Sequence, residues 1–101
     1  MWWSWLRNTN RSFMRIEIRL YGGFAVAAGS EHANLEFEGT SLGEAIAQMR
    51  RRWPAIGELL DGPGKGSAVF VLNGRALEPP DPRTKLNTGD VLSIMPFVAG
   101  G

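Results

Sequence analysis

The sequence predicts an α+β fold in which one mixed sheet of four to five strands carries one main helix packed on one face. Residues 15–20 and 34–38 alternate apolar and polar side chains, as strands with one buried face do. Residues 41–53 then place apolar side chains at helical spacing, and apolar runs return at residues 68–72 and 91–95. A chain of 101 residues has the length of one domain with one core.

The first two strands each have one apolar side, and we expect them to pair antiparallel. Residues 21–23 end the first strand, and the small residues 25–30 predict a loop between the two. The apolar sides of the strands carry Ile16, Ile18 and Leu20 in the first, and Leu35 and Phe37 in the second.

A capped helix is predicted after the second strand. Ser41 and Glu44 match the capping box S-x-x-E, in which each side chain binds a backbone N–H left over at the helix start. Pro54 ends the helix because it has no N–H to donate to the preceding turn. We expect residues 56–60 to add a short helical turn, and the glycine-rich residues 61–67 to form a loop.

The last third of the chain predicts three short strands. Residues 68–72 lead into Asn73-Gly74, the favoured two-residue hairpin turn, and residues 75–77 follow it as a strand. Residues 78–87 hold three prolines and predict a surface connection before the final strand, residues 91–95. The predicted core comprises Ile16, Ile18, Leu20, Leu35, Phe37, Leu42, Ile46, Met49, Trp53 and Leu92.

The composition removes several classes of function. The formal net charge of +1 gives no reason to expect nucleic acid as a partner. The absence of cysteine removes disulfides, thiolate metal sites and cysteine nucleophiles, and it agrees with a reducing compartment such as the cytoplasm. No apolar run reaches membrane-spanning length, so a membrane is not an expected partner.

Residues 1–13 differ from the rest of the chain, with three tryptophans followed by polar and basic residues. They lack the order of charged, apolar and cleavage regions that a secretory signal has. We interpret them as an extension upstream of the true start; the alternative is a tryptophan-rich arm that docks on a membrane surface or a partner. The domain is then residues 14–97, followed by a flexible tail of residues 98–101.

The end of the chain carries the most specific pattern. A Gly89-Asp90 turn leads into an apolar last strand, Pro96, and a terminal Val98-Ala99-Gly100-Gly101. With the element order from Met14 onward, this pattern resembles the β-grasp fold of ubiquitin, and most closely the small subunit of molybdopterin synthase among the ubiquitin-like sulfur carriers. Phe97, where that family often has a second proline, and the N-terminal extension depart from the family pattern.

The resemblance implies a sulfur carrier that is not catalytic alone and acts as the sulfur-donating subunit of a synthase, a transferase complex. An adenylyltransferase of the ubiquitin-activating type would use ATP and Mg²⁺ to form an acyl-adenylate at Gly101, and a persulfide protein would convert it to a thiocarboxylate. The large synthase subunit would then receive the tail and pass the sulfur to a pterin precursor. The carrier itself would bind no cofactor and no metal.

The residue types at the tail suit this chemistry. Four extended residues span about 13–14 Å, so residues 98–101 can enter another protein's cleft. Gly100 and Gly101 lack Cβ atoms and can pass a narrow channel, and Gly101 would be the reacting residue. For docking we predict an apolar patch on the open face of the sheet, which the tail would continue. The predicted partner-binding residues are Val69, Val71, Val91, Met95, Phe97, Val98 and Ala99.

Other functions stay open at this stage. The chain could carry sulfur for thiamine synthesis or tRNA thiolation, although the insert at residues 55–67 favours the molybdopterin type. It could also be a protein modifier joined to lysines through Gly101, or an interaction domain whose tail is never activated. Its glycine-rich loop lacks the Gly-Lys-Ser/Thr order of a phosphate-binding loop, and the presence of one histidine, His32, argues against a metal site or a catalytic triad.

Overall fold

Five strands and three helices make up residues 13–61 and 68–96, the part of the chain that the computed structural model describes. The elements are β1 (Phe13–Leu20), α1 (Gly23–Ala28), β2 (His32–Glu38), α2 (Leu42–Arg52), α3 (Pro54–Asp61), β3 (Ala68–Leu72), β4 (Arg75–Leu77) and β5 (Val91–Pro96). The strands form one sheet in the order β2-β1-β5-β3-β4. β1 and β5 are parallel and the other neighbours are antiparallel, so the predicted mixed sheet is confirmed.

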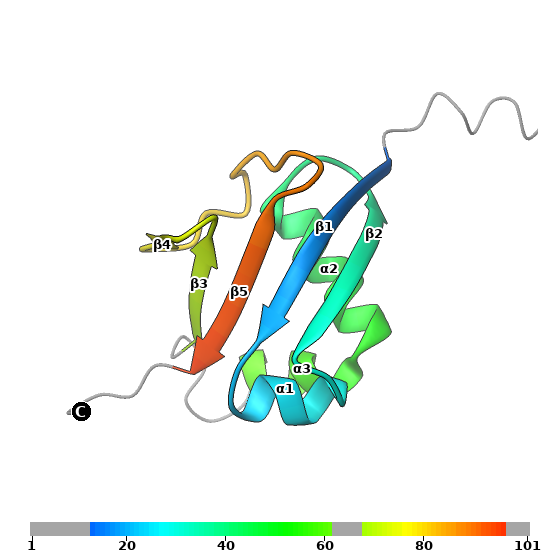
Figure 1. The fold of residues 1–101 in the computed structure, drawn as a ribbon, viewed down its shortest axis with the longest axis vertical. Helices are drawn as coiled ribbons and strands as arrows, with labels where there is room; N and C mark the ends of the chain where they lie inside the picture. Colours follow the sequence, from blue (N-terminus) through cyan, green and yellow to red (C-terminus); the bar gives the residue numbers. More distant parts are fainter. Residues whose placement is uncertain (1–12, 62–67, 97–101) are drawn as a thin grey trace, which may run out of the picture.

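The helices lie on one side of this sheet, with α2 crossing behind it and α1 at the end where β5 stops (Figure 1). The predicted capping box starts α2: Ser41 Oγ accepts from Glu44 N at 3.3 Å, and Glu44 Oε1 accepts from Ser41 N at 3.0 Å. The helix ends at Arg52, and Pro54 opens α3, which is longer than the single turn predicted there.

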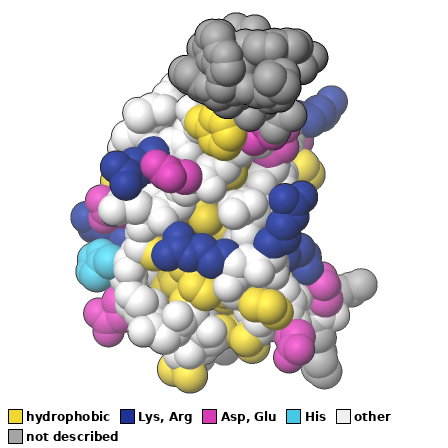
Figure 2. Space-filling model, turned by 90° about the vertical axis from the view of Figure 1, so that its right-hand side faces the viewer, with side chains coloured by type: hydrophobic (Ala, Val, Ile, Leu, Met, Phe, Trp, Pro, Cys, Tyr) yellow, Lys and Arg dark blue, Asp and Glu magenta, His cyan; other side chains and the backbone are white. Residues whose placement is uncertain are grey.

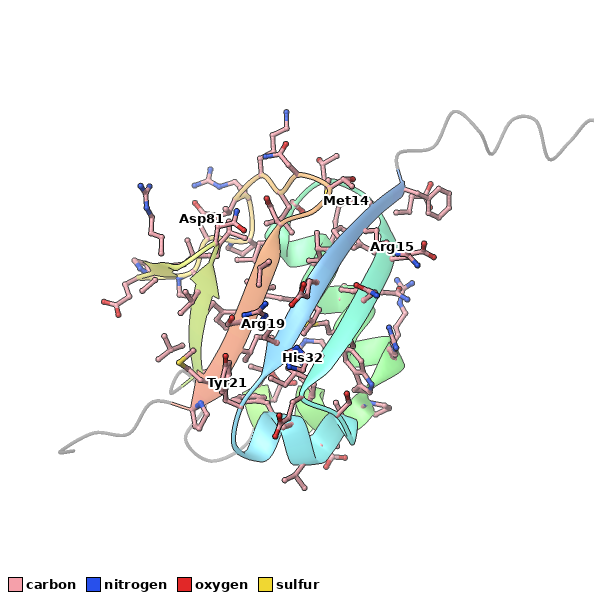
Figure 3. All side chains as sticks on the ribbon, viewed as in Figure 1. Met14, Arg15, Arg19, Tyr21, His32 and Asp81 are labelled. Atoms are coloured by element: carbon pink, nitrogen blue, oxygen red, sulfur yellow. The ribbon has the colours of Figure 1, made fainter. Side chains whose placement is uncertain are left out.

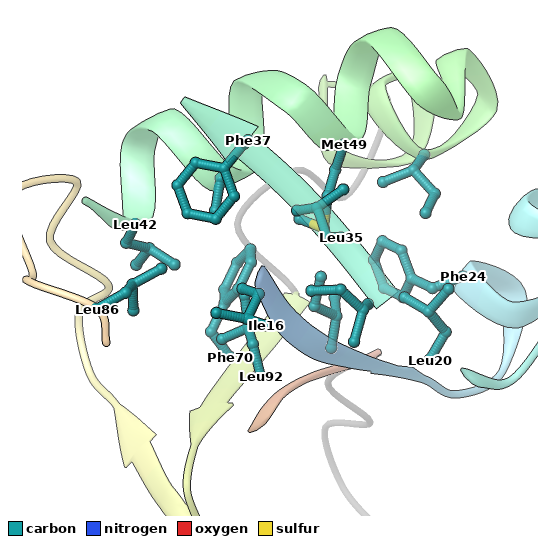
Figure 4. Close-up of a cluster of buried hydrophobic side chains, with 14 of the residues drawn as sticks. Ile16, Leu20, Phe24, Leu35, Phe37, Leu42, Met49, Phe70, Leu86 and Leu92 are labelled. Atoms are coloured by element: carbon teal, nitrogen blue, oxygen red, sulfur yellow. The ribbon is translucent and has the colours of Figure 1, made fainter. Parts of the chain in front are cut away.

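Leucine, isoleucine and phenylalanine side chains from the sheet meet α2, α1 and α3 in one core (Figure 4). Eight of the ten predicted core residues are buried, and the other two, Ile46 and Trp53, pack partly buried against the core. The sheet contributes Ile16, Ile18, Leu20, Leu35, Phe37, Phe70, Leu92 and Ile94 to this core.

One prediction between the strands was wrong, and another missed a buried residue. The segment read as a loop at residues 25–30 contains helix α1, which Phe24 anchors in the core and which ends at Gly29 with a φ of 75°. Its alanines favour a helix, and the flanking glycines concealed that signal. The connection over residues 78–87 is exposed at most of its positions, as predicted, but its Leu86 is fully buried.

The strand boundaries also shift slightly. β1 begins at Phe13, which we had assigned to the N-terminal extension and which pairs with Glu38. Residues 1–12, the loop residues 62–67 and residues 97–101 lie outside the described part of the chain. Within residues 13–61 and 68–96, no helix has the length and apolar character needed to span a bilayer.

Candidate functional site

The point at which the chain leaves the sheet is held by three elements. Pro96, the last described residue, pairs with Ala68 of β3 at the end of β5. The backbone N–H of Tyr21 donates to Ile94 O at 3.1 Å and ties the end of β1 to the same strand. Gly22 then passes so close to Pro96 that a Cβ placed on it would lie 2.9 Å from the proline Cγ. The direction in which the C-terminal segment starts is therefore set by the fold.

The predicted tail residues follow this point directly. Phe97, Val98, Ala99, Gly100 and Gly101 all lie outside the described residues, so their predicted roles stay predictions.

The four predicted patch residues within the described strands share the open face of the sheet. Leu92 and Ile94 of β5 are fully buried toward the helices, as predicted, which places Val91 and Met95 on the opposite face. Val69 lies opposite Met95 and Val71 lies opposite Ser93 in the β3–β5 register. All four predicted side chains are half-buried, so they form one apolar surface, the open-face patch, that leads to the chain exit.

Charged side chains occupy the other half of the same face. Glu17 of β1 lies opposite Val91, and Arg19 lies opposite Ser93, so the charged strip borders the open-face patch. Arg19 Nε donates to Glu17 Oε2 at 2.6 Å, and this contact raises the pKa of the guanidinium above its usual value. Figure 3 shows Arg15, Arg19 and His32 along this part of the sheet, where Arg15 Nε lies 3.5 Å from Glu36 Oε2.

Sequence reasoning recognised these charged residues as outward-facing but did not place them beside the patch. That placement depends on the parallel pairing of β1 with β5, two strands separated by 70 residues between Leu20 and Val91. The strict alternation of Arg15, Glu17 and Arg19 was the available signal.

The arginine run at the end of α2 and the turn aspartates have structural roles. Arg50 makes two hydrogen bonds to the Asp61 carboxylate, at 2.6 and 3.0 Å, and so joins α2 to α3. Arg52 donates to Asn34 O at 2.6 Å and lies over the Trp53 ring at 4.5 Å. Asp90 accepts from the Asn73 amide at 3.0 Å. Two of the three arginines are therefore engaged within the fold.

In residues 13–61 and 68–96, no three histidine or carboxylate side chains are close enough to hold a metal ion. His32 is exposed and has Glu17 as a neighbour at 4.0 Å. The Gly101 carboxylate, which the sequence analysis predicts as the reacting group, lies outside the described residues.

Comparison with protein families gives one match. The model of the ThiS family matches residues 18–101, which include the end of β1, the other four strands, the open-face patch and the diglycine. The chain belongs to the ThiS family. It is thus one of the ubiquitin-like sulfur carriers and has their β-grasp fold, as the sequence predicted. A search of the curated proteins found no match.

Solved structures agree on the fold. The small archaeal modifier protein 1 of Methanosarcina acetivorans is 21% identical with a TM-score of 0.71, covering 89% of this chain and 99% of its own. A putative molybdopterin converting factor subunit 1 of Pyrococcus furiosus is also 21% identical with a TM-score of 0.71, covering 84% and 99%. A chain in the complex of subunits 1 and 2 of the Helicobacter pylori molybdopterin-converting factor is 26% identical with a TM-score of 0.56, covering 87% and 100%.

Proposed function

We propose that this ThiS-family chain is the small subunit of molybdopterin synthase and carries sulfur as a thiocarboxylate on Gly101. The observation that supports this most is the family match, which continues past the end of β5 through Gly100 and Gly101. The similar structures from Pyrococcus furiosus and Helicobacter pylori are molybdopterin converting factors by name, which favours this pathway. The insert between α2 and β3 favours it as well.

The chemistry has three steps. The Gly101 carboxylate attacks the α-phosphorus of ATP within an adenylyltransferase, giving the acyl-adenylate and pyrophosphate. A persulfide sulfur attacks the acyl carbon and displaces AMP, and a thiol then cleaves the resulting disulfide to leave the thiocarboxylate. All three steps take place in the cytoplasm, and the partner proteins supply ATP, Mg²⁺ and the reducing thiol.

The fold contributes position and reach. Five residues follow Pro96 in the sequence and extend to about 17 Å. The body can therefore stay at the surface of a partner while Gly101 enters its active site. Val69, Val71, Val91 and Met95 would rest on that surface beside the entrance, followed by Phe97, Val98 and Ala99. The large synthase subunit and the adenylyltransferase would use the same docking side in turn.

A second candidate is a protein modifier conjugated to lysines through Gly101. The similar archaeal structures from Methanosarcina acetivorans and Haloferax volcanii carry the name small archaeal modifier protein, which favours this use. Both functions need the same activated chain end, so the body of the protein does not separate them. A carrier for thiamine synthesis or tRNA thiolation would need that end as well.

Intact-mass spectrometry tests the proposal. Protein isolated from its own cells should first show that Gly101 is the last residue. Incubation with the adenylyltransferase, ATP, Mg²⁺ and a persulfide donor should then exchange one oxygen for one sulfur. A variant lacking Gly101, and one with an alanine added after it, should stay unmodified; equal modification of either variant contradicts the proposal. Conjugates of higher mass with other proteins would instead support the modifier.

A further inference from the structure

The two edges of the sheet differ in what they offer. On the side that β2 borders, acidic, basic and hydrophobic side chains are mixed, and the carboxylates of Glu36 and Glu44 are already bound, by Arg15 and by the capping box (Figure 2). The opposite edge ends in the β3–β4 hairpin, whose two turn residues are Asn73 and Gly74. Asparagine is chemically labile, and most so before glycine, which has no side chain to hinder attack on the amide.

The hairpin turn is open to solvent. Asn73 and Gly74 have φ values of 52° and 85°, as a two-residue turn of this type requires. Both residues are exposed, and a Cβ placed on Gly74 would meet nothing within 4 Å. Water therefore reaches the turn, and accessibility alone does not protect the Asn73 amide.

Although the turn is exposed, the Asn73 carboxamide is held at both of its ends. Asn73 Oδ1 accepts from Val91 N at 2.8 Å, and Nδ2 donates to Asp90 Oδ1 at 3.0 Å. Because a backbone N–H only donates and a carboxylate only accepts, the orientation of the carboxamide is unambiguous. Asp90 is fixed in turn, since its Oδ2 accepts from Asn87 N at 2.8 Å. We call these contacts the turn clasp.

Deamidation of Asn73 would proceed through a succinimide. The backbone nitrogen of Gly74 loses its proton to solvent and bonds to Asn73 Cγ, the Cγ–Nδ2 bond breaks, and Nδ2 takes up a proton and leaves as ammonia. Water then opens the ring at either carbonyl carbon and leaves an aspartate or an isoaspartate. The net reaction consumes water and releases ammonia, with no oxidant or reductant.

The turn clasp opposes ring formation in two ways. The Asn73 carboxamide must leave Val91 and Asp90 before its Cγ can turn toward the Gly74 nitrogen, so both hydrogen bonds are lost on the way to the ring. The attacking nitrogen and the tetrahedral oxygen also carry developing negative charge, which a carboxylate at hydrogen-bond distance disfavours. Unfolding removes both effects, and removal of the Asp90 carboxylate removes the second effect and one of the hydrogen bonds.

We propose that Asn73 is a latent deamidation site, which Asp90 keeps intact by holding its carboxamide. The site rests on the fold alone and is independent of the chemistry at Gly101. It lies at the end of the open-face patch opposite to Pro96, because Val91, the first residue of β5, is bound to Asn73 through both of its backbone groups. Conversion would place a second carboxylate beside Asp90 and loosen the patch at Val91.

Mass spectrometry of proteolytic peptides after incubation at mildly alkaline pH tests this proposal, since deamidation exchanges NH₂ for OH in the peptide that contains Asn73. The full chain in buffer should convert at least about tenfold more slowly than the same chain in concentrated urea, because urea removes both hydrogen bonds. Asn34 and Asn87, which precede leucine and threonine, should convert slowly in both and serve as internal controls. Equal rates at Asn73 in buffer and in urea, or no conversion in urea, overturn the proposal.

Asp90→Ala identifies the residue responsible. In buffer it should raise the rate of conversion of Asn73 by about tenfold, since it removes a charge-assisted hydrogen bond and the neighbouring negative charge. Asp81→Ala is the matched control, because Asp81 also accepts from a backbone N–H in a turn, that of Arg83 at 2.9 Å, but does not bind Asn73. Equal acceleration in the two variants overturns the proposal. Asp90→Asn keeps an acceptor for Asn87 N and should give an intermediate rate, which preserves the test if Asp90→Ala does not fold.

The product gives a second, independent readout. Asn73→Asp, which reproduces the deamidated side chain, should lower the folding equilibrium constant by about tenfold, because it loses the donor to Asp90 and places two carboxylates together. Adding Asp90→Asn exchanges the two side chains, restores a donor and an acceptor between them, and should recover most of this loss in urea unfolding. A double variant as unstable as Asn73→Asp would show that the two side chains do not meet in solution, and this result overturns the proposal.

Discussion

Val69 of β3 lies directly opposite Met95 of β5, and both side chains are half-buried on the face of the sheet that the helices leave open. Met95 is one residue from Pro96, where the described chain ends. The pair is therefore the part of the open-face patch nearest to the tail. A partner that takes Gly101 into its active site would meet this pair next.

Replacing Met95 with lysine should weaken binding to the adenylyltransferase by about tenfold or more, since a buried interface contact is worth about 1–2 kcal/mol. The fold should persist because Met95 does not belong to the buried core. Val26→Lys is the matched control, because Val26 is 82% exposed on α1, outside the patch. Calorimetric titration measures the affinity of both variants for the adenylyltransferase. Equal losses of affinity would show that the patch is not part of the interface.

Gly22 should tolerate alanine less well than Gly29 does. Both have positive φ values, 59° and 75°, so alanine strains the backbone at each by about 1 kcal/mol. At Gly22 the new methyl group would also lie 2.9 Å from Pro96 Cγ, whereas at Gly29 it meets nothing within 4 Å. Denaturant unfolding gives the free energy of unfolding that each variant loses, and the difference between the two losses is the cost of the Pro96 contact. Only Gly22→Ala should also slow thiocarboxylate formation; equal rates would mean that the chain exit is not set by this contact.

The capping box predicts a specific response to acid. Hydrogen bonds from the backbone N–H of Thr40 and from Ser41 lower the pKa of Glu44 below its ordinary value of 4.5. A carboxyl group with a lower pKa in the folded state stabilises the fold at pH values above 4.5. This contribution is lost as the pH falls through the lowered pKa. Thermal melting should therefore depend less on pH below 4.5 in Glu44→Gln than in the parent.

Glu58→Gln on α3, an exposed glutamate outside the capping box, is the control for that comparison. Asp81, whose pKa Arg83 lowers by its backbone N–H and its guanidinium, adds acid sensitivity of the same sign to every variant. A residual slope is thus expected in Glu44→Gln. An unchanged dependence of the melting temperature on pH in Glu44→Gln would show that the capping carboxylate does not contribute to the acid sensitivity.

Local patterns in the sequence predicted much of the fold because their signals lie within a few residues. Ile16, Ile18 and Leu20 alternate with charged residues, and Ser41 with Glu44 forms the box that starts α2. The open-face patch was also predictable, since burying Leu92 and Ile94 leaves Val91 and Met95 on the other side. The pairing of β1 with β5 was not predictable, because no local pattern encodes a contact between strands that are distant in the sequence.

The burial of Leu86 was not predicted from the sequence. This residue stands between the prolines of residues 79–82 and the Gly89 turn, a context that is typical of a surface connection. In the structure Leu86 N donates to Thr40 O at 2.8 Å, and the side chain lies beside Leu42 at the start of α2 (Figure 4). The connection therefore covers the end of the core between the sheet and α2.

Truncation of Leu86 to alanine should destabilise the domain by about 2–5 kcal/mol, as for other fully buried leucines, because the cavity stays lined by rigid neighbours. Leu59→Ala is the control: Leu59 is 44% exposed on α3 and should lose well under half as much. Urea unfolding followed by circular dichroism gives both values. Similar losses would mean that the connection does not pack against the core in solution. A large loss confined to Leu86 would show that a segment without helix or strand completes the core.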